Sequence, residues 1–437
     1  MIFCEIVLSL WGISPYFTFS LDIYTFSNDN GTSSILNYNL KQLVMEVFMK
    51  KIVVSSALSA LLVLPAMAFE VHNNDDTKVD IYGSIRGYVG YGESGKAGAD
   101  AGYLIGIQNN SQFGVKFQKD KFKANVEWGA VEPGVDGNVG STGWRQYWGS
   151  YTTSAGTILF GKTNTPTIDN GFTNDFFNND NGSSGFGGIA TGSRKIQIQY
   201  NVAGLSLALV EDETGDGRNG GAARPNQESP RIATSYTIND DKGKPIFKAA
   251  ATYKYYNSNT IQGNVPAGTS AYHAWIGYKP TFGSSFLSLM ANYGKNGHLY
   301  GEQLTRISTG GYHHSTLDVA GLDAQRAGAR VEFGTKLSSD MGLIIGAGYQ
   351  ATFGGKGQKN ALKTASEAKK DSMIHSYSAF IQLPYKVSSN FTFAPQVSFY
   401  QTIEGTSGAR SNTTAGTNTF SGKETGVIAA ARIKWDF

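Results

Sequence analysis

The sequence predicts an all-β protein, a transmembrane antiparallel β-barrel of about sixteen strands. Two observations carry this prediction. Short segments in which apolar and polar residues alternate recur from residue 69 to residue 437, as expected of strands whose two faces meet different solvents. No segment of the same region contains the ~20 consecutive apolar residues that a transmembrane helix needs. Strands, and not helices, are therefore expected to cross the membrane.

The composition fits such a barrel. Glycine (54), tyrosine (23) and phenylalanine (25) are abundant and proline (11) is scarce, as many strands with tight turns and aromatic girdles require. The formal net charge of +3, without a dense basic block, argues against a nucleic-acid partner. The single cysteine, Cys4, excludes an internal disulfide and a cysteine-ligated metal.

The alternation is clearest in residues 122–128 (FKANVEW), 326–333 (RAGARVEF) and 427–437 (VIAAARIKWDF). In a soluble sandwich the apolar face points inward, whereas in a membrane barrel lipid takes that face and water takes the polar one. The predicted strands span residues 78–91, 110–118, 122–131, 143–152, 156–163, 193–201, 204–212, 229–239, 246–257, 271–280, 286–294, 323–338, 341–353, 373–386, 391–403 and 425–437.

One connection differs from the others. Residues 164–192 are far longer than the ~2–5 residues of a hairpin turn and are rich in Asn, Asp, Gly and Phe. A barrel of about sixteen strands encloses water, whereas ~8 strands are filled by their own side chains. Packing of this loop against the inner wall would shelter Phe172, Phe176, Phe177 and Phe186. We therefore expect a constriction loop folded into the lumen.

The N-terminal region predicts export. Residues 49–68 (MKKIVVSSALSALLVLPAMA) combine two lysines, a short apolar run, a proline and a small-residue cleavage pattern, which together define a signal peptide. The mature chain then begins at Phe69 and forms one barrel over residues 69–437. Residues 1–48 precede the signal and lack barrel alternation. We interpret them as a mis-assigned upstream extension, and a genuine extra membrane segment is the weaker alternative.

Four segments resemble the general bacterial porin family of Gram-negative outer membranes. They are residues 78–83 (KVDIYG), 111–117 (SQFGVKF), 159–162 (LFGK) and 434–437 (KWDF). The resemblance implies a homotrimer of barrels in outer-membrane lipid and lipopolysaccharide, each with its third loop inside the lumen. It also implies that Trp435 and Phe437 belong to the signal read by the outer-membrane assembly machinery.

The family pattern further implies a transverse field between a basic wall and an acidic loop. Carried over by position, the wall residues are Arg145, Arg194 and Lys116, whereas Gln112 stands where many members have arginine. Arg86 joins them because its parity matches that of the polar face of its strand. The family's Pro-Glu-Phe-Gly-Gly turn is reduced here to residues 184–188 (SGFGG), so the negative side falls to three loop acids. They are Asp169, Asp175 and Asp180.

The expected function is a water-filled channel for passive diffusion of small hydrophilic solutes and ions, with no cofactor and no metal. The six histidines show neither a zinc nor a catalytic spacing, so no enzyme is expected. Three alternatives are a substrate-selective channel, an adhesin and an outer-membrane hydrolase. The first stays open, because the sequence excludes neither a continuous aromatic slide nor a dense cluster of one charge. An adhesin would not need this strand number or the long inserted loop.

Overall fold

The computed structural model divides the chain into two compact units, Met1–Leu64 and Pro65–Phe437. In the first unit it describes only a two-stranded pairing of β1 (Ile6–Leu8) with β2 (Leu21–Ile23). In the second unit it describes residues 69–74, 76–94, 102–108, 111–129, 143–169, 171–175, 187, 194–211, 229–256, 268–300, 325–353, 374–404, 410–411, 419–420 and 423–437. The expected signal peptide, residues 49–68, and nearly all of residues 1–48 lie outside the described residues.

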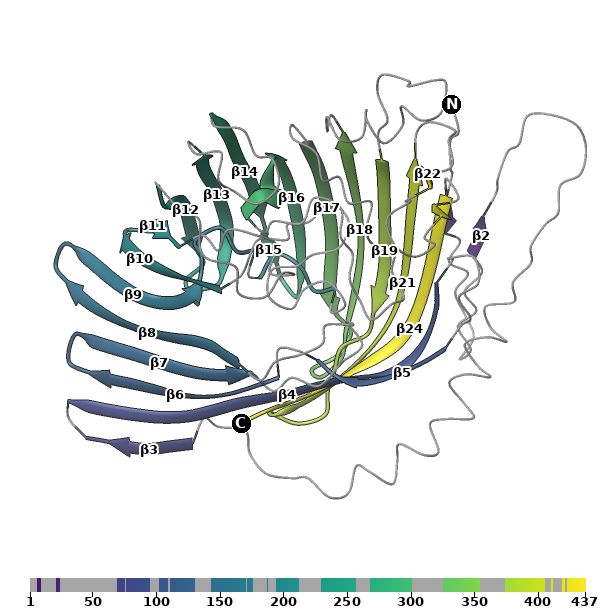
Figure 1. The fold of residues 1–437 in the computed structure, drawn as a ribbon. Coiled ribbons are helices and arrows are strands. Elements are labelled where there is room, and N and C mark those ends of the chain that lie inside the picture. The colour runs from purple at the N-terminus through teal and green to yellow at the C-terminus, as the bar shows by residue number, and fades with distance from the viewer. Residues whose placement is uncertain are drawn as a thin grey trace, which may run out of the picture. The chain divides into compact units, whose positions relative to one another are not determined.

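The second unit contains the predicted closed antiparallel barrel of sixteen strands (Figure 1). Its first half comprises β4 (Thr77–Ser94), β5 (Gly102–Ile107) with β6 (Gln112–Lys119), β7 (Phe122–Gly129), β8 (Gly143–Thr153), β9 (Gly156–Asn164), β10 (Arg194–Val202), β11 (Leu205–Val210) and β12 (Arg231–Asn239). Its second half comprises β13 (Pro245–Tyr256), β14 (Thr269–Tyr278) with β15 (Thr281–Phe282), β16 (Ser285–Lys295), β17 (Gln325–Lys336), β18 (Gly342–Phe353), β19 (Ile374–Gln382) with β20 (Tyr385–Lys386), β21 (Phe391–Glu404) and β24 (Lys423–Asp436). A 3-10 turn, η1 (Gly297–Tyr300), follows β16, and β22 (Arg410–Ser411) pairs with β23 (Thr419–Phe420) apart from the barrel.

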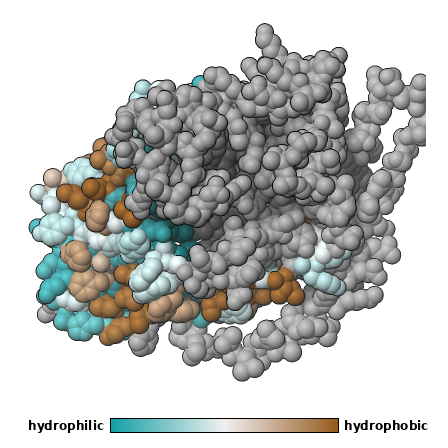
Figure 2. All heavy atoms as spheres, in the orientation of Figure 1, coloured by the Kyte–Doolittle hydropathy of each residue, from teal (hydrophilic) through white to brown (hydrophobic). Residues whose placement is uncertain are grey.

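Exposure confirms the predicted inversion of the two faces. On β7, Phe122 and Trp128 are exposed on the outer face, whereas Asn125 and Glu127 on the lumen face are buried. The same alternation leaves large apolar side chains exposed on strand after strand, among them Ile85, Ile158, Ile198, Leu207, Ile276 and Ile345. Apolar residues gather on the outer surface of the strands at the left of Figure 2. An apolar surface of this kind is stable where it meets lipid.

Both ends of the barrel segment pair with β4. β24 pairs with the later part of β4, from Gly426 opposite Ser94 to Asp436 opposite Ser84. β3 (Phe69–Asn73), which the alternation did not predict, pairs with the earlier part of the same edge of β4. The last residue completes the ring, since Phe437 and Gly83 exchange two backbone hydrogen bonds of 3.0 and 2.7 Å. Closure therefore leaves no unpaired edge between the first and last strands.

The predicted strand 110–118 is longer than expected and broken. β5 and β6 both pair with β4, and the chain between them turns at Gln108, whose backbone NH donates to the carbonyl of Arg86. The alternation of apolar and polar residues does not reveal this break, because β5 and β6 both pair with the same strand, β4. Within the part of the chain that the structure describes, no helix has the length and apolarity needed to cross a membrane.

Candidate pore constriction

The chain that follows β9 runs along the inner wall of the barrel. Residues 165–169 are buried, as are Phe172 and Asp175, although they belong to a connecting loop. Side chains from the wall donate hydrogen bonds to their backbone carbonyls. Trp275 Nε1 on β14 lies 2.8 Å from the oxygen of Thr167, and Lys248 Nζ on β13 lies 2.7 Å from that of Ile168. These donors attach the start of the loop to β13 and β14.

An apolar contact holds the same segment. The Phe172 side chain is fully buried and meets the Trp275 ring edge-on, with centroids 5.7 Å apart. Ala250 and Met290 complete this cluster. Phe172 therefore lies against the wall as the sequence predicted, whereas Phe176, Phe177 and Phe186 are outside the described residues.

Glu332 on β17 makes several of the contacts that attach the loop to the wall. Its carboxylate accepts hydrogen bonds from the Thr173 hydroxyl at 2.5 Å and from the backbone NH and side-chain amide of Asn174, both at 2.9 Å. Arg330 Nε lies 3.4 Å from the same carboxylate. The Glu332 side chain is fully buried, so its carboxylate has lost its contacts with water. These hydrogen bonds and the Arg330 guanidinium take the place of those contacts.

Two of the predicted loop acids are buried at this wall. Asp169 forms an ion pair with Arg330 at 3.3 Å, and Asp175 accepts hydrogen bonds from Gln396 at 2.6 Å and Tyr400 at 3.2 Å on β21. These contacts attach the loop to β17 and β21. The third acid, Asp180, lies outside the described residues.

Gly187 marks the return of the loop to the wall. Its φ is +91°, and a Cβ there would lie 2.1 Å from the backbone oxygen of Ala329 on β17. Asn292 on β16 donates a hydrogen bond of 2.8 Å to its carbonyl. The glycine-rich turn of residues 184–188 thus includes a position where only glycine fits, because both backbone conformation and space exclude a side chain.

The predicted basic residues Arg86, Lys116 and Arg145 lie on β4, β6 and β8, within a run of four adjacent strands that includes β7. Arg145 Nε forms an ion pair of 2.8 Å with Glu127, whose side chain is 2% exposed. Glu127 pairs with Gln146 and Trp128 pairs with Trp144, so Arg145 is the extra residue of a β-bulge on β8. Arg86 Nε donates to Ser84 Oγ at 2.9 Å. These three residues therefore share one wall of the barrel.

Arg194 is placed differently from the other three. It opens β10 with the same parity as Ile198 and Tyr200, whose side chains are exposed on the outer face. Its neighbour Lys195 takes the parity of the lumen face, which it shares with the buried Gln197. The family pattern thus indicates Arg194 as the lumen residue, whereas the alternation on β10 gives the lumen parity to Lys195.

Sequence reasoning missed three residues that form contacts at this candidate site, which are Glu127, Arg330 and Glu332. All three have lumen parity in segments 122–128 and 326–333, so their orientation was readable. Their partners were not readable, because they lie up to 159 residues away along the chain. Among the described residues, no group of three or more His, Cys, Asp or Glu side chains is placed to hold a metal ion.

No protein-family model matches this sequence, and no curated protein is detectably similar to it. Solved structures do match. The outer membrane channel DcaP of Acinetobacter baumannii has a TM-score of 0.52 and 14% identity, covering 86% of this chain and 100% of its own. An anion-selective porin from Comamonas acidovorans also has a TM-score of 0.52, with 15% identity, covering 83% of this chain and 100% of its own. At such identities the likeness concerns the fold, and residues 69–437 have the fold of an outer-membrane porin.

Proposed function

We propose that this protein is a passive diffusion channel of the outer membrane for small hydrophilic solutes and ions. One observation carries the proposal. The barrel is closed by sixteen strands, a number that leaves an aqueous channel, and the described residues of the loop that follows β9 are attached to its inner wall. Diffusion through such a pore needs no cofactor and no catalytic group.

A planar-bilayer measurement tests this function directly. The purified, refolded protein should insert as discrete conductance steps that scale with the bulk conductivity of the salt solution. A chain that folds, as judged by its heat-modifiable mobility in gel electrophoresis, but gives no steps would be a closed barrel. That result would favour an adhesin or an outer-membrane hydrolase over a channel.

The charged side chains of the wall support a role in ion preference, and we propose Arg86, Lys116 and Arg145 as its basic side. The loop acids Asp169 and Asp175 supply negative charge on the opposite side of the proposed field, with Asp180 as the third candidate. Because Asp169 is paired with Arg330 and Asp175 is buried by Gln396 and Tyr400, their field on a solute is partly compensated. Arg194 stays a fourth candidate for the basic side, since its Nε is buried although its position on β10 has outer-face parity.

We expect Arg145 and Glu127 to act on selectivity as a pair. Arg145→Ala should move the reversal potential in a salt gradient toward cations, because it removes a positive charge and uncovers the Glu127 carboxylate. Glu127→Gln should move it toward anions, and the double variant should lie near the unmodified protein. Equal reversal potentials in all four proteins would contradict a position of this pair in the conducting path.

We also propose export through the signal peptide of residues 49–68 and assembly as a homotrimer in lipid and lipopolysaccharide. The mature protein is then expected to begin at Phe69, the first residue of β3. Mass spectrometry of the protein purified from outer membranes checks this. Peptides from residues 1–48 in that material would show that the upstream segment is translated and retained.

A further inference from the structure

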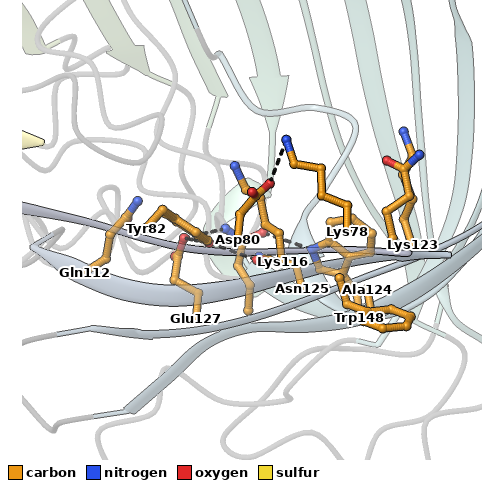
Figure 3. Close-up of a pocket in the computed structure, with 13 residues that line it drawn as sticks. Lys78, Asp80, Tyr82, Gln112, Lys116, Lys123, Ala124, Asn125, Glu127 and Trp148 are labelled. Atoms are coloured by element: carbon orange, nitrogen blue, oxygen red, sulfur yellow. Dashed lines mark hydrogen bonds and ion pairs between the residues drawn. The ribbon is translucent and has the colours of Figure 1, made fainter. Parts of the chain in front are cut away.

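A cavity of about 450 Å³ lies in the barrel wall near one end of β4, β6, β7 and β8 (Figure 3). β6 and β7 meet there in a tight turn at Asp120 and Lys121, and turns this short are typical of the periplasmic end of a barrel. The lining includes Lys78, Asp80, Lys116, Gln118, Lys123 and Asn125. In Figure 3 the side chains of Lys78, Asp80 and Lys123 project from the same side of the strands.

The charges of this cavity do not cancel. Lys78 Nζ lies 3.4 Å from Glu70 and 3.5 Å from Asp80, and the carboxylate of Glu127 is paired with Arg145. Lys116 Nζ lies over the Tyr82 ring, 4.4 Å from its centroid, which is not a carboxylate contact. Among the described residues, no carboxylate lies within ion-pair distance of Lys116 or Lys123. Asp80 on β4 is the cross-strand neighbour of Lys116, but it forms its ion pair with Lys78. The exposed side chains of Lys116 and Lys123 therefore lie on the lumen wall without an ion pair to a described carboxylate, and the cavity keeps an excess of positive charge.

The two lysines stand at opposite corners of a square. On β6 and β7, Lys116 is opposite Asn125 and Gln118 is opposite Lys123, and all four share the lumen parity. Diagonal neighbours on adjacent strands are ~7–8 Å apart at Cα, and like charges this close on one face repel each other. The other two corners carry amides, whose NH₂ groups are hydrogen-bond donors. An anion between the corners would relieve the repulsion and meet the ammonium and amide donors of these four residues, with the Asp80 carboxylate held by Lys78 on the neighbouring strand.

We propose that Lys116, Gln118, Lys123 and Asn125 form a binding subsite for small oxyanions with two negative charges, of the inorganic phosphate type. The inference rests on the proposed channel function, since the solute reaches this wall through the lumen. A dianion can pair with both lysines at once, whereas a monoanion such as chloride or nitrate compensates only one charge. The subsite therefore favours dianions over the salt anions that share the pore.

Single-channel recording tests the subsite. In about 0.1 M KCl, where the Debye length is ~10 Å, added inorganic phosphate at about pH 8 should reduce the chloride current with a saturating dependence on concentration. Nitrate added at the same ionic strength should not. The double variant Lys116→Gln/Lys123→Gln should raise the half-saturating phosphate concentration about tenfold, because each exposed ion pair contributes only modest free energy.

The matched control is Lys119→Gln/Lys121→Gln. It removes the same charge from the same end of the barrel, but Lys119 has the opposite parity on β6 and Lys121 lies in the turn. The control should keep the phosphate dependence of the unmodified protein. A non-saturating response of the unmodified protein, or equal shifts in the two double variants, would overturn the subsite.

Failure of the channel function is distinguishable from failure of the subsite. A protein that gives no conductance steps in KCl alone is not a channel, whatever phosphate does. Equilibrium dialysis of radiolabelled inorganic phosphate against the detergent-solubilised barrel then tests the square without transport. Saturable binding that the Lys116→Gln/Lys123→Gln variant loses and the control variant keeps supports the subsite. Equal binding by both variants rejects it.

Discussion

Glu332→Ala is expected to release the loop from the wall and raise the single-channel conductance. The substitution leaves the Asn174 backbone NH without its acceptor and removes one of the carboxylates that lie beside Arg330. Breaking a buried, hydrogen-bonded charge pair costs about 3–5 kcal/mol, more than a loop segment outside the strand ladder can absorb without moving. The conductance of refolded protein in planar bilayers checks this result.

Two variants serve as controls for the release. Glu332→Gln keeps an oxygen acceptor and should give an intermediate conductance, because it loses the charge but not every hydrogen bond. Asp340→Ala removes an exposed acid from the turn between β17 and β18 and should change nothing. If Glu332→Ala conducts like the unmodified protein while its barrel is folded, the loop is held in place by other contacts.

Deletion of Phe437 is expected to remove most of the folded protein from the outer membrane. Phe437 exchanges two backbone hydrogen bonds with Gly83, and its ring covers Gly83, where a Cβ would lie 2.2 Å from the ring. Its loss therefore weakens the closing pair of β24 with β4 at its end. It also removes the aromatic end that resembles the assembly signal. Heat-modifiable trimer in outer-membrane fractions measures the effect.

Two further variants separate the two roles of this residue. Phe437→Tyr keeps the ring and the backbone and should assemble normally, whereas Phe437→Asp should assemble poorly. Refolding of both into detergent, without any assembly machinery, tests closure alone. Normal amounts of folded trimer from the deletion in cells would contradict both roles of Phe437.

The architecture was predictable from the sequence because its determinant is local. Period-two alternation identifies a strand with two solvents on its faces, and the predicted strand 193–201 differs from β10, Arg194–Val202, by one residue at each end. β3 escaped prediction because it is only five residues long, too short for alternation to be distinctive. The break before β6 escaped it because both pieces pair with the same strand.

The site was less predictable, since most of its contacts join the loop to strands that are distant along the chain. Parity gave Arg86, Lys116 and Arg145 their face, but it did not identify Glu127 as the partner of Arg145. The sequence predicted that the loop aspartates would approach these basic residues, and the described contacts of Asp169 and Asp175 are with β17 and β21. A pairing between residues more than 150 positions apart depends on the path of the loop, which no local pattern encodes.

The way in which the wall holds the loop has a consequence for how this pore can evolve. Five side chains of the wall donate hydrogen bonds to backbone carbonyls of residues 167–172, and a backbone carbonyl is present whatever side chain the loop residue carries. The donors are Trp275, Lys248, Lys279, Ser288 and Arg330. Exchanges among the loop's solvent-facing side chains therefore leave these anchors intact. If this loop sets solute preference as proposed, mutation can change that preference while the path of the backbone stays constant, so specificity and architecture are free to diverge at different rates.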